Sequence, residues 1–362
     1  MIEDAVARLR LIRSDQIGPV TYRQLIARFG NAQAALDALP DLARRGGGRT
    51  LKITAVADAQ RELDAVAAFG ARLLFLGTPD YPNLLARFES APPVLAAKGD
   101  TALLERPAVA VVGARNASAA GTRFARGLAN DLGDAGFVVV SGLARGIDAA
   151  AHEGALGGGT VGVIAGGVDV CYPPETADLQ RRIGERGLVV AEMPIGTQPQ
   201  ARHFPRRNRV IAGLAAGTVV VEGALRSGSL ITARLAAEAG REVMAVPGSP
   251  LDPRAQGCNM LIREGATLIQ SAADVVEAVS AFSGGGELRS LSLNFDSAPI
   301  AYTADDGDFA QVAGLLSPTP VPIDELVRLA GLPSAVVAAV LLDLELGGRV
   351  VRHAGGRVAL AG

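Results

Sequence analysis

Eight short apolar runs, separated by stretches with helical spacing, constrain the fold of this chain more than any other feature. They are ARLLFLG, AVAVVG, FVVVSG, TVGVIAGG, LVVAEM, TVVVEGA, EVMAVPG and ATLIQ, all between residues 71 and 282. A strand that is apolar along its whole length is buried on both faces, which is typical of a parallel sheet covered by helices. The sequence therefore predicts an α/β fold with a parallel sheet over residues 71–282.

The segments on either side of this block have other patterns. Residues 1–70 predict short helices, and Ile17–Gly30 has the look of a helix-hairpin-helix turn, although a plain α-hairpin used for packing fits as well. Residues 283–307 are rich in Gly, Ser and Asp, which indicates a linker. Residues 308–362 predict three helices and a hairpin turning at Gly355–Gly356, the order of a winged helix.

The composition limits the class of protein. A formal net charge of −2 argues against a generally basic surface, so a nucleic-acid site would have to be a local patch. Cys171 and Cys258 give neither a disulfide framework nor the spacing of a metal site, which suits a reducing compartment. Because we find no apolar run of about 18 residues and no signal-peptide layout, we expect a cytoplasmic protein without a membrane segment. We also expect no metal and no cofactor.

Arginines are concentrated in the segment HFPRRNRVIAGL and just before it. The cluster comprises Arg202, Arg206, Arg207, Asn208 and Arg209. It lies between two predicted strands, so its side chains are expected at the same sheet edge as the other strand-end loops. Phe204 offers a flat face for a base, and such stacking contributes roughly 1–3 kcal/mol per base. In the alternative, Phe204 packs into the core and the arginines pair with Glu192 and Glu222.

Three further turns at strand ends are candidates for binding anions. Gly113, Arg115 and Ser118 could form a phosphate cradle at a helix N-terminus, Arg145 adds charge to the next turn, and Ser227, Gly228 and Ser229 begin another helix. A dinucleotide site is not expected, because Arg115 stands where Gly-x-Gly-x-x-Gly needs its second Gly. Several anion sites along one edge suit a polyanion better than a single small phosphate.

Two other features allow more than one interpretation. Asp148 and His152 are four residues apart on one predicted helix face, and a hydrogen bond between them explains the pair better than a metal or acid–base site. Asp169 and Tyr172 could touch a ligand, but a tight turn into a helix that starts with Pro explains them equally well.

Taken in order, VVGARNAS, SGLARGID, HFPRRNRVIAGL, SGSLITARLAAE and GCNMLIREGA resemble the DNA-processing protein A family, DprA/Smf. The resemblance runs from about residue 5 to the C-terminus and is densest over residues 107–270. It implies an N-terminal SAM-like helical domain, an extended Rossmann-like domain and a C-terminal winged helix. It also implies sequence-independent binding and protection of single-stranded DNA, dimerisation through the Rossmann-like domain, and loading of RecA recombinase during natural transformation, without catalysis.

The resemblance further implies roles for individual residues. The family's glycine–serine–arginine turn corresponds to Gly113, Ala114 and Arg115, where Ala114 departs from the usual hydroxyl. Its Phe-x-x-Arg-Asn-Arg element corresponds to Phe204, Arg207, Asn208 and Arg209, and a basic residue that precedes this Phe corresponds to Arg202.

Two other functions compete with this interpretation. A phosphoribohydrolase-like enzyme shares the sheet type, but it needs a Glu three residues after a Thr, and here Leu235 follows Thr232 at that spacing. A repressor would read DNA with the winged helix, yet the helix Ser334–Glu345 contains two acids and neither Lys nor Arg. We expect that helix to contact protein, or the chain's own Rossmann-like domain, rather than DNA.

Overall fold

The computed structural model describes residues 2–47, 51–283, 304–353 and 355–361. Contacts among these residues separate the chain into two compact units. One unit joins the N-terminal helices, up to Arg61, with the described C-terminal residues, and the other begins at Glu62 and contains the predicted sheet. Most of the expected linker, residues 284–303, lies outside the described residues.

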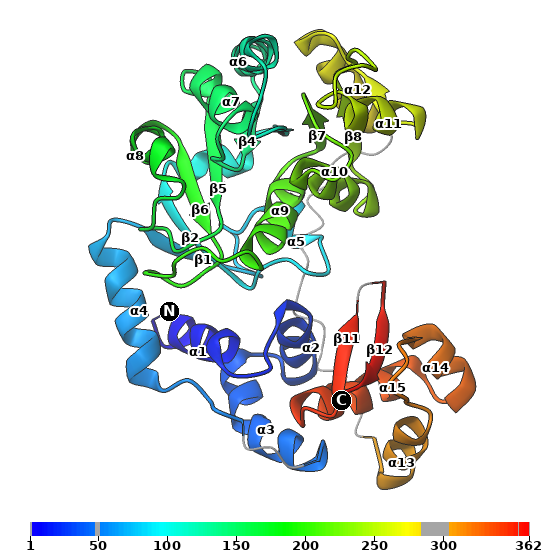
Figure 1. Ribbon diagram of the computed structural model, residues 1–362. Helices are drawn as coiled ribbons and strands as arrows, with labels where there is room; N and C mark the ends of the chain where they lie inside the picture. Colours follow the sequence, from blue (N-terminus) through cyan, green and yellow to red (C-terminus); the bar gives the residue numbers. More distant parts are fainter. Residues whose placement is uncertain (1, 48–50, 284–303, 354, 362) are drawn as a thin grey trace. The chain divides into compact units, whose positions relative to one another are not determined.

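A nine-stranded sheet forms the centre of the second unit in the described part of the chain (Figure 1). Its strand order is β1-β2-β6-β5-β4-β3-β7-β8-β9. The strands are β1 (Arg72–Phe75), β2 (Val94–Gly99), β3 (Ala108–Val112), β4 (Val138–Ser141), β5 (Thr160–Ile164), β6 (Leu188–Ala191), β7 (Gly217–Val220), β8 (Glu242–Ala245) and β9 (Thr267–Leu268). Strands β3 to β9 are parallel, whereas β1 and β2 pair antiparallel, and β2 joins the sheet antiparallel to β6.

All eight predicted runs contain a strand, so the mainly parallel sheet is confirmed. Strand β2 was not predicted, because VLAAKG has one β-branched residue and ends in Lys98 and Gly99. The first four residues of β2 are nevertheless buried, because Ala96 joins an apolar cluster and α8 contacts the strand, while β1 and β6 pair with its two edges. Tertiary packing, not local propensity, therefore makes this segment a strand.

The strand order reverses at β3. The chain passes from β3 to its neighbour β4 and on to β5 and β6, and later returns to place β7 on the other side of β3. In doubly wound sheets, ligands bind in the crevice outside the carboxyl ends of the two strands that flank such a switch point. A ligand site is therefore expected at the loops after β3, β4, β5 and β7.

Helices cover the sheet and build the core. Helices α6 (Ala119–Asp134), α7 (Ile147–Ala155) and α12 (Ala272–Ser283) share one apolar cluster with strand residues such as Val109 and Val139. Helix α9 (His203–Leu214) contacts β3, β4 and β5, and α10 (Gly228–Glu238) lies beside it (Figure 1). The shorter helices of this unit are α5 (Asn83–Ala86), α8 (Ala177–Arg186) and α11 (Gln256–Arg263).

The C-terminal residues form the predicted winged helix. It consists of α13 (Asp306–Gly314), α14 (Ile323–Ala330), α15 (Ser334–Leu346) and a sheet of β10 (Val321–Pro322), β12 (Arg357–Leu360) and β11 (Val350–His353). Gly355 and Gly356 turn the hairpin with φ of 76° and 63°, values that favour glycine. Within the described residues no single helix is long and apolar enough to cross a membrane; α14 and α15 reach that composition only as a pair bent by 116°.

Helix α15 packs on the N-terminal helices of its own unit, which are α1 (Ile2–Arg13), α2 (Pro19–Phe29) and α3 (Ala32–Arg45). Helix α4 (Val56–Ala68) begins in this unit and ends in the unit that contains the large sheet. Leu342 and Leu346 enter the apolar cluster of those helices, while Val340 and Leu344 lie in the core of the winged helix. Most residues of α15 are buried and only Ser334 is exposed, so little of the helix surface is available to enter a DNA groove. The partner of α15 in this unit is therefore the set of N-terminal helices, which the sequence analysis did not name among the expected partners.

Candidate nucleic-acid interface

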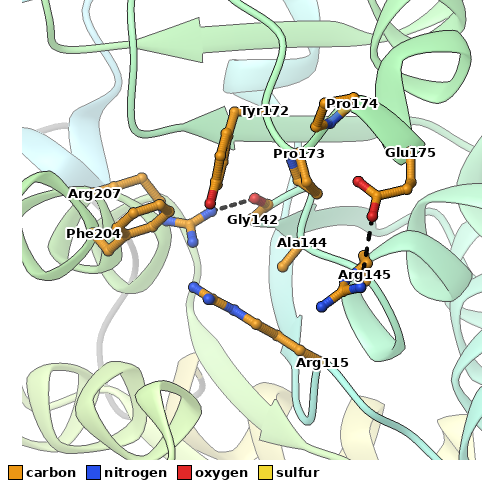
Figure 2. Close-up of a pocket in the computed structure, with 10 residues that line it drawn as sticks. All are labelled: Arg115, Gly142, Ala144, Arg145, Tyr172, Pro173, Pro174, Glu175, Phe204 and Arg207. Carbon is orange, nitrogen blue, oxygen red and sulfur yellow. Dashed lines mark hydrogen bonds and ion pairs between the residues drawn. The ribbon is translucent and has the colours of Figure 1, made fainter. Parts of the chain in front are cut away.

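A pocket of about 270 Å³ opens at the carboxyl ends of β3, β4 and β5 (Figure 2). The loop after β3 contributes one residue, the loops after β4 and β5 contribute most of the wall, and α9 supplies two side chains. The lining comprises Arg115, Gly142, Ala144, Arg145, Tyr172, Pro173, Pro174, Glu175, Phe204 and Arg207. Segments far apart in the sequence therefore meet at one edge of the sheet, as the predicted topology requires.

Two aromatic rings and a guanidinium lie together in this pocket. The ring centroids of Tyr172 and Phe204 are 5.9 Å apart at an interplanar angle of 55°, and Tyr172 is 50% exposed. The guanidinium carbon of Arg115 lies 5.2 Å from the centroid of the Phe204 ring, within the range of a cation–π interaction. The pocket thus offers apolar faces beside a positive charge, which matches a base attached to its phosphate.

Arg207 holds the strand ends together from inside the pocket wall. It is 7% exposed; its Nη1 donates to the carbonyl oxygens of Gly142 and Val163 (2.9 Å for the latter), and its Nε donates to Asn208 Oδ1 at 3.2 Å. Burial lowers the pKa of Arg207 to about 10, and the nearby Asp148 opposes that shift. The side chain is therefore still positively charged at neutral pH.

Glycine at position 142 makes this arrangement possible. A Cβ there would overlap Arg207 Nη1 and approach Asp148 Oδ2 to 2.8 Å. Burial raises the pKa of Asp148, while Arg207 and three backbone N–H groups lower it. The expected hydrogen bond between Asp148 and His152 is replaced by other partners, since His152 Nδ1 lies 2.7 Å from Thr160 Oγ1 and Asp148 accepts from Ala144.

The remaining charges of the pocket are exposed. Arg145 pairs with Glu175 at 3.6 Å, and both side chains are more than half exposed, so the pair is screened by solvent and easily opened. Arg202 and Arg206 lie exposed at the start of α9 and carry positive charge beyond the pocket. The exposed arginines differ in this respect from the buried Arg207, whose side chain is held by hydrogen bonds.

The structure separates Asn208 and Arg209 from the pocket. Asn208 Nδ2 donates to the carbonyl oxygen of Gly228 at 3.2 Å, so it joins α9 to the start of α10. Arg209 is 9% exposed, forms an ion pair with Glu192 and donates to the carbonyl oxygen of Ser90. This is the internal pairing with Glu192 that the sequence left open as an alternative.

The cradle expected around Gly113 and Ser118 is occupied by a carboxylate of the same chain. Glu222 accepts hydrogen bonds from the Ser118 amide at 2.9 Å and from the Ser118 hydroxyl at 2.6 Å. A Cβ on Gly113 would lie 2.6 Å from Ile147, so this glycine permits close packing of α7 rather than approach of a ligand. The groups proposed to hold a phosphate here are thus already bonded.

The start of α10 is also partly satisfied within the chain. Ser227 is the N-cap residue, and its hydroxyl lies 2.7 Å from the hydroxyl of the buried Ser229. Gly228 is exposed and has room for a side chain. None of these three residues lines the pocket of Figure 2.

Sequence reasoning did not assign Tyr172 and Glu175 to the site. In the sequence analysis, Tyr172 is named only as a possible ligand contact and Glu175 is not named. The signal was present, because both follow strand β5 and four Tyr and ten Phe are the only aromatic residues in the chain. An exposed Tyr in a strand-end loop is informative when aromatic residues are this scarce.

Comparison with known proteins agrees with this architecture. The family model described as DNA recombination-mediator protein A matches residues 72–280, a DprA-like N-terminal HHH domain matches residues 2–65, and a DprA winged helix domain matches residues 296–356. The DNA processing protein DprA of Streptococcus pneumoniae is 49% identical over 202 residues, which are 54% of this chain and 70% of that protein.

Two solved structures have the same fold. DNA processing protein A from Streptococcus pneumoniae aligns with a TM-score of 0.62 at 37% identity, over 75% of this chain and 95% of that one. DNA processing protein A from Helicobacter pylori, described for its single-stranded DNA binding mode, aligns with a TM-score of 0.53 at 27% identity, over 59% of this chain and 96% of that one. Since the first family model alone spans more than half of the sequence, this chain belongs to the DNA recombination-mediator protein A family.

Proposed function

We propose that this chain binds single-stranded DNA without sequence preference and holds it at the pocket of Figure 2. The observation that carries the proposal is the convergence of three arginines and two aromatic rings from separate segments. Arg115, Arg145 and Arg207 supply charge for phosphates, and Tyr172 and Phe204 supply faces for a base. The single-stranded DNA binding mode described for the Helicobacter pylori relative supports it.

The charge distribution favours a polymer over a free nucleotide. Arg202 and Arg206 are exposed on the first turn of α9, outside the pocket lining. A single nucleotide that fills the pocket would leave both arginines unused, whereas a strand with recurring phosphates could reach them. We infer supporting roles for the other predicted residues: Asn208 and Arg209 fix α9, and Gly113, Ser118, Ser227, Gly228 and Ser229 shape the neighbouring loops.

Replacing Arg115 and Phe204 by Ala tests the two halves of the site. We expect R115A to weaken binding of oligothymidine and to flatten the slope of log K against log salt by about 0.7 for one lost phosphate contact. F204A should weaken binding by about 1–3 kcal/mol with little change in that slope, because a stacked base releases no counterions. Fluorescence anisotropy at several salt concentrations measures both quantities.

Arg126→Ala is the matched control, since Arg126 is an exposed arginine that pairs with Glu153 away from the pocket. It should keep both the affinity and the salt slope. A slope for R115A equal to that of the unmodified chain would remove Arg115 from the interface and with it the central part of this proposal.

We further propose that the chain acts in the cytoplasm as a non-catalytic mediator that protects incoming DNA and loads RecA recombinase on it during natural transformation. Membership of a recombination-mediator family supports this role. The chain should then shorten the lag before RecA hydrolyses ATP on a strand covered by single-strand-binding protein. An unchanged lag at full strand occupancy would argue against loading.

We also propose a homodimer formed through the Rossmann-like domain. The edge strand β9 has only two residues, Leu268 on it is 45% exposed, and α11 presents the half-buried Met260, Leu261 and Ile262. Two copies would present two pockets to one strand, which raises apparent affinity through avidity. Light scattering of the purified chain measures its mass directly.

The hydrolase alternative has little support at this site. Glu175 is the only carboxylate in the described lining of the pocket, and it pairs with Arg145. Acid–base hydrolysis of a glycosidic bond uses a pair of suitably placed groups. Release of free base or phosphate from nucleotides incubated with the pure chain would revive this alternative.

A further inference from the structure

The crevice between β3 and β7 is the place where a doubly wound sheet would hold a nucleotide phosphate. The two strands are adjacent and parallel, and α6 begins just after β3. A helix N-terminus at such a switch point presents unpaired N–H groups and a partial positive charge. In this chain the backbone amide of Ser118, at the start of α6, faces the side chain of Glu222, which lies two residues after the end of β7.

The carboxylate of Glu222 is bound there as an anionic ligand would be. One oxygen accepts from the Ser118 amide at 2.9 Å and the other from the Ser118 hydroxyl at 2.6 Å. The same hydroxyl accepts from the Gly121 amide at 2.9 Å, one turn into α6. A Cβ built on Gly121 would lie 2.6 Å from the carboxylate, so the carboxylate rests directly on the first turn of the helix.

The backbone on both sides of Glu222 is fixed. The amide of Val221 donates to the carbonyl oxygen of Val112 at 3.1 Å, which extends the pairing of β7 with β3. The amide of Gly223 donates to Arg254, and Gly223 accepts from Gly257, so the following loop is tied to the start of α11. A carboxylate tethered in this way is present at high effective concentration and competes strongly with a free anion.

We propose that Glu222 is a specificity-determining residue. Its carboxylate occupies the switch-point crevice and excludes inorganic phosphate and mononucleotides from it. Anion binding is thereby confined to the neighbouring pocket, where Arg115 and Arg207 provide the charge. This inference concerns the crevice alone and does not depend on which polymer the pocket binds.

Glu222→Ala and Glu222→Gln separate the two ways in which the side chain could act. Alanine empties the crevice, so we expect E222A to bind inorganic phosphate on the order of tenfold or more tightly than the unmodified chain, through the N-terminus of α6. Glutamine removes the charge but still fills the space, so E222Q should gain no such binding. The readout is the rise in melting temperature with phosphate at constant ionic strength.

The double variant E222A/R115A identifies the place of binding, since it should retain the phosphate response if the crevice is the site. A response that disappears with Arg115 would assign it to the pocket instead and overturn the proposal. So would a folded E222A without any response. If E222A does not fold, the ¹H–¹⁵N signal of Ser118 in the unmodified chain decides: it should stay fixed during a phosphate titration, and a saturable shift would show that Glu222 excludes nothing.

Discussion

At the scale of single residues, the most constrained feature of the site is the contact between Gly142 and Arg207. The guanidinium is held by two carbonyl oxygens and Asn208, and its charge faces the buried Asp148. A buried charge tolerates little displacement, because each lost hydrogen bond leaves a desolvated group without a partner. Position 142 therefore has room for a hydrogen atom but not for a methyl group.

Gly142→Ala tests this constraint. The added methyl group has to displace Arg207 or the β4 loop, so we expect a loss of about 1–3 kcal/mol in the free energy of unfolding and weaker binding of oligothymidine. Urea denaturation measures the first effect. Gly157→Ala is the control, since nothing lies within 4 Å of a Cβ built there, and it should change stability by less than about 0.5 kcal/mol. Equal stability of both variants would contradict the assigned role of Gly142.

The arginine cluster shows what the sequence could and could not predict about single residues. Arg202 and Arg206 are four apart, so on α9 they share the exposed face, while Arg207, Asn208 and Arg209 turn inward. The sequence places the cluster between two predicted strands, and all five side chains were expected at the same edge of the sheet. Once the helix is known to begin at His203, its periodicity separates the exposed residues from the buried ones.

At the scale of elements, the pairing of α15 with the N-terminal helices is held by a buried charge. Arg28 Nη1 donates to Asp343 Oδ1 at 3.1 Å, and the two side chains are 12% and 4% exposed. Burial raises the pKa of Asp343, and Arg28 opposes this shift. The backbones also approach closely, because a Cβ on Gly347 would overlap the carbonyl group of Gly46.

Reversing this ion pair tests whether it stabilises the contact of α15 with the N-terminal helices. Asp343→Arg alone should cost about 3–5 kcal/mol, because it leaves two buried like charges, and adding Arg28→Asp should restore a large part of that loss. Hydrogen exchange of the α3 amides reports the stability of this unit. Reversal of the exposed pair Arg44–Asp41 is the control and should have little effect. No rescue by the double variant would show that the pair does not hold the contact.

Most elements were predictable because their apolar patterns are strong and local. The eight strands carry continuous apolar runs, and the winged helix carries helical periods followed by a Gly-Gly turn. Strand β2 and the partner of α15 were not predictable, since both depend on surfaces that other segments provide. The contact of Glu222 with Ser118 at the start of α6 was not predictable for the same reason, since 104 positions separate the two residues.

At the scale of the whole molecule, the proposed DNA site and the winged helix belong to different units. All residues that line the pocket lie in the unit that begins at Glu62, and α15 belongs to the other. The pocket and the winged helix can therefore be separated by truncation.

Deleting residues 305–362 tests this separation. We expect the affinity for oligothymidine to change by less than about tenfold, which corresponds to 1.4 kcal/mol, because no pocket residue is removed. The N-terminal helices should lose protection from hydrogen exchange, since Leu342 and Leu346 leave their apolar cluster. A loss of affinity beyond tenfold would assign part of the interface to the C-terminal residues.

The pairing of the two ends of the chain has a consequence for its synthesis. Arg28 and Asp343 are separated by 315 positions, so the N-terminal helices leave the ribosome long before their partner exists. At about 5–20 residues per second, the delay is roughly 15–60 s. During that interval the ribosome synthesises the segment that forms the sheet, and the apolar side of the N-terminal helices still lacks its partner α15. A chaperone that shields nascent apolar surface would find its target there.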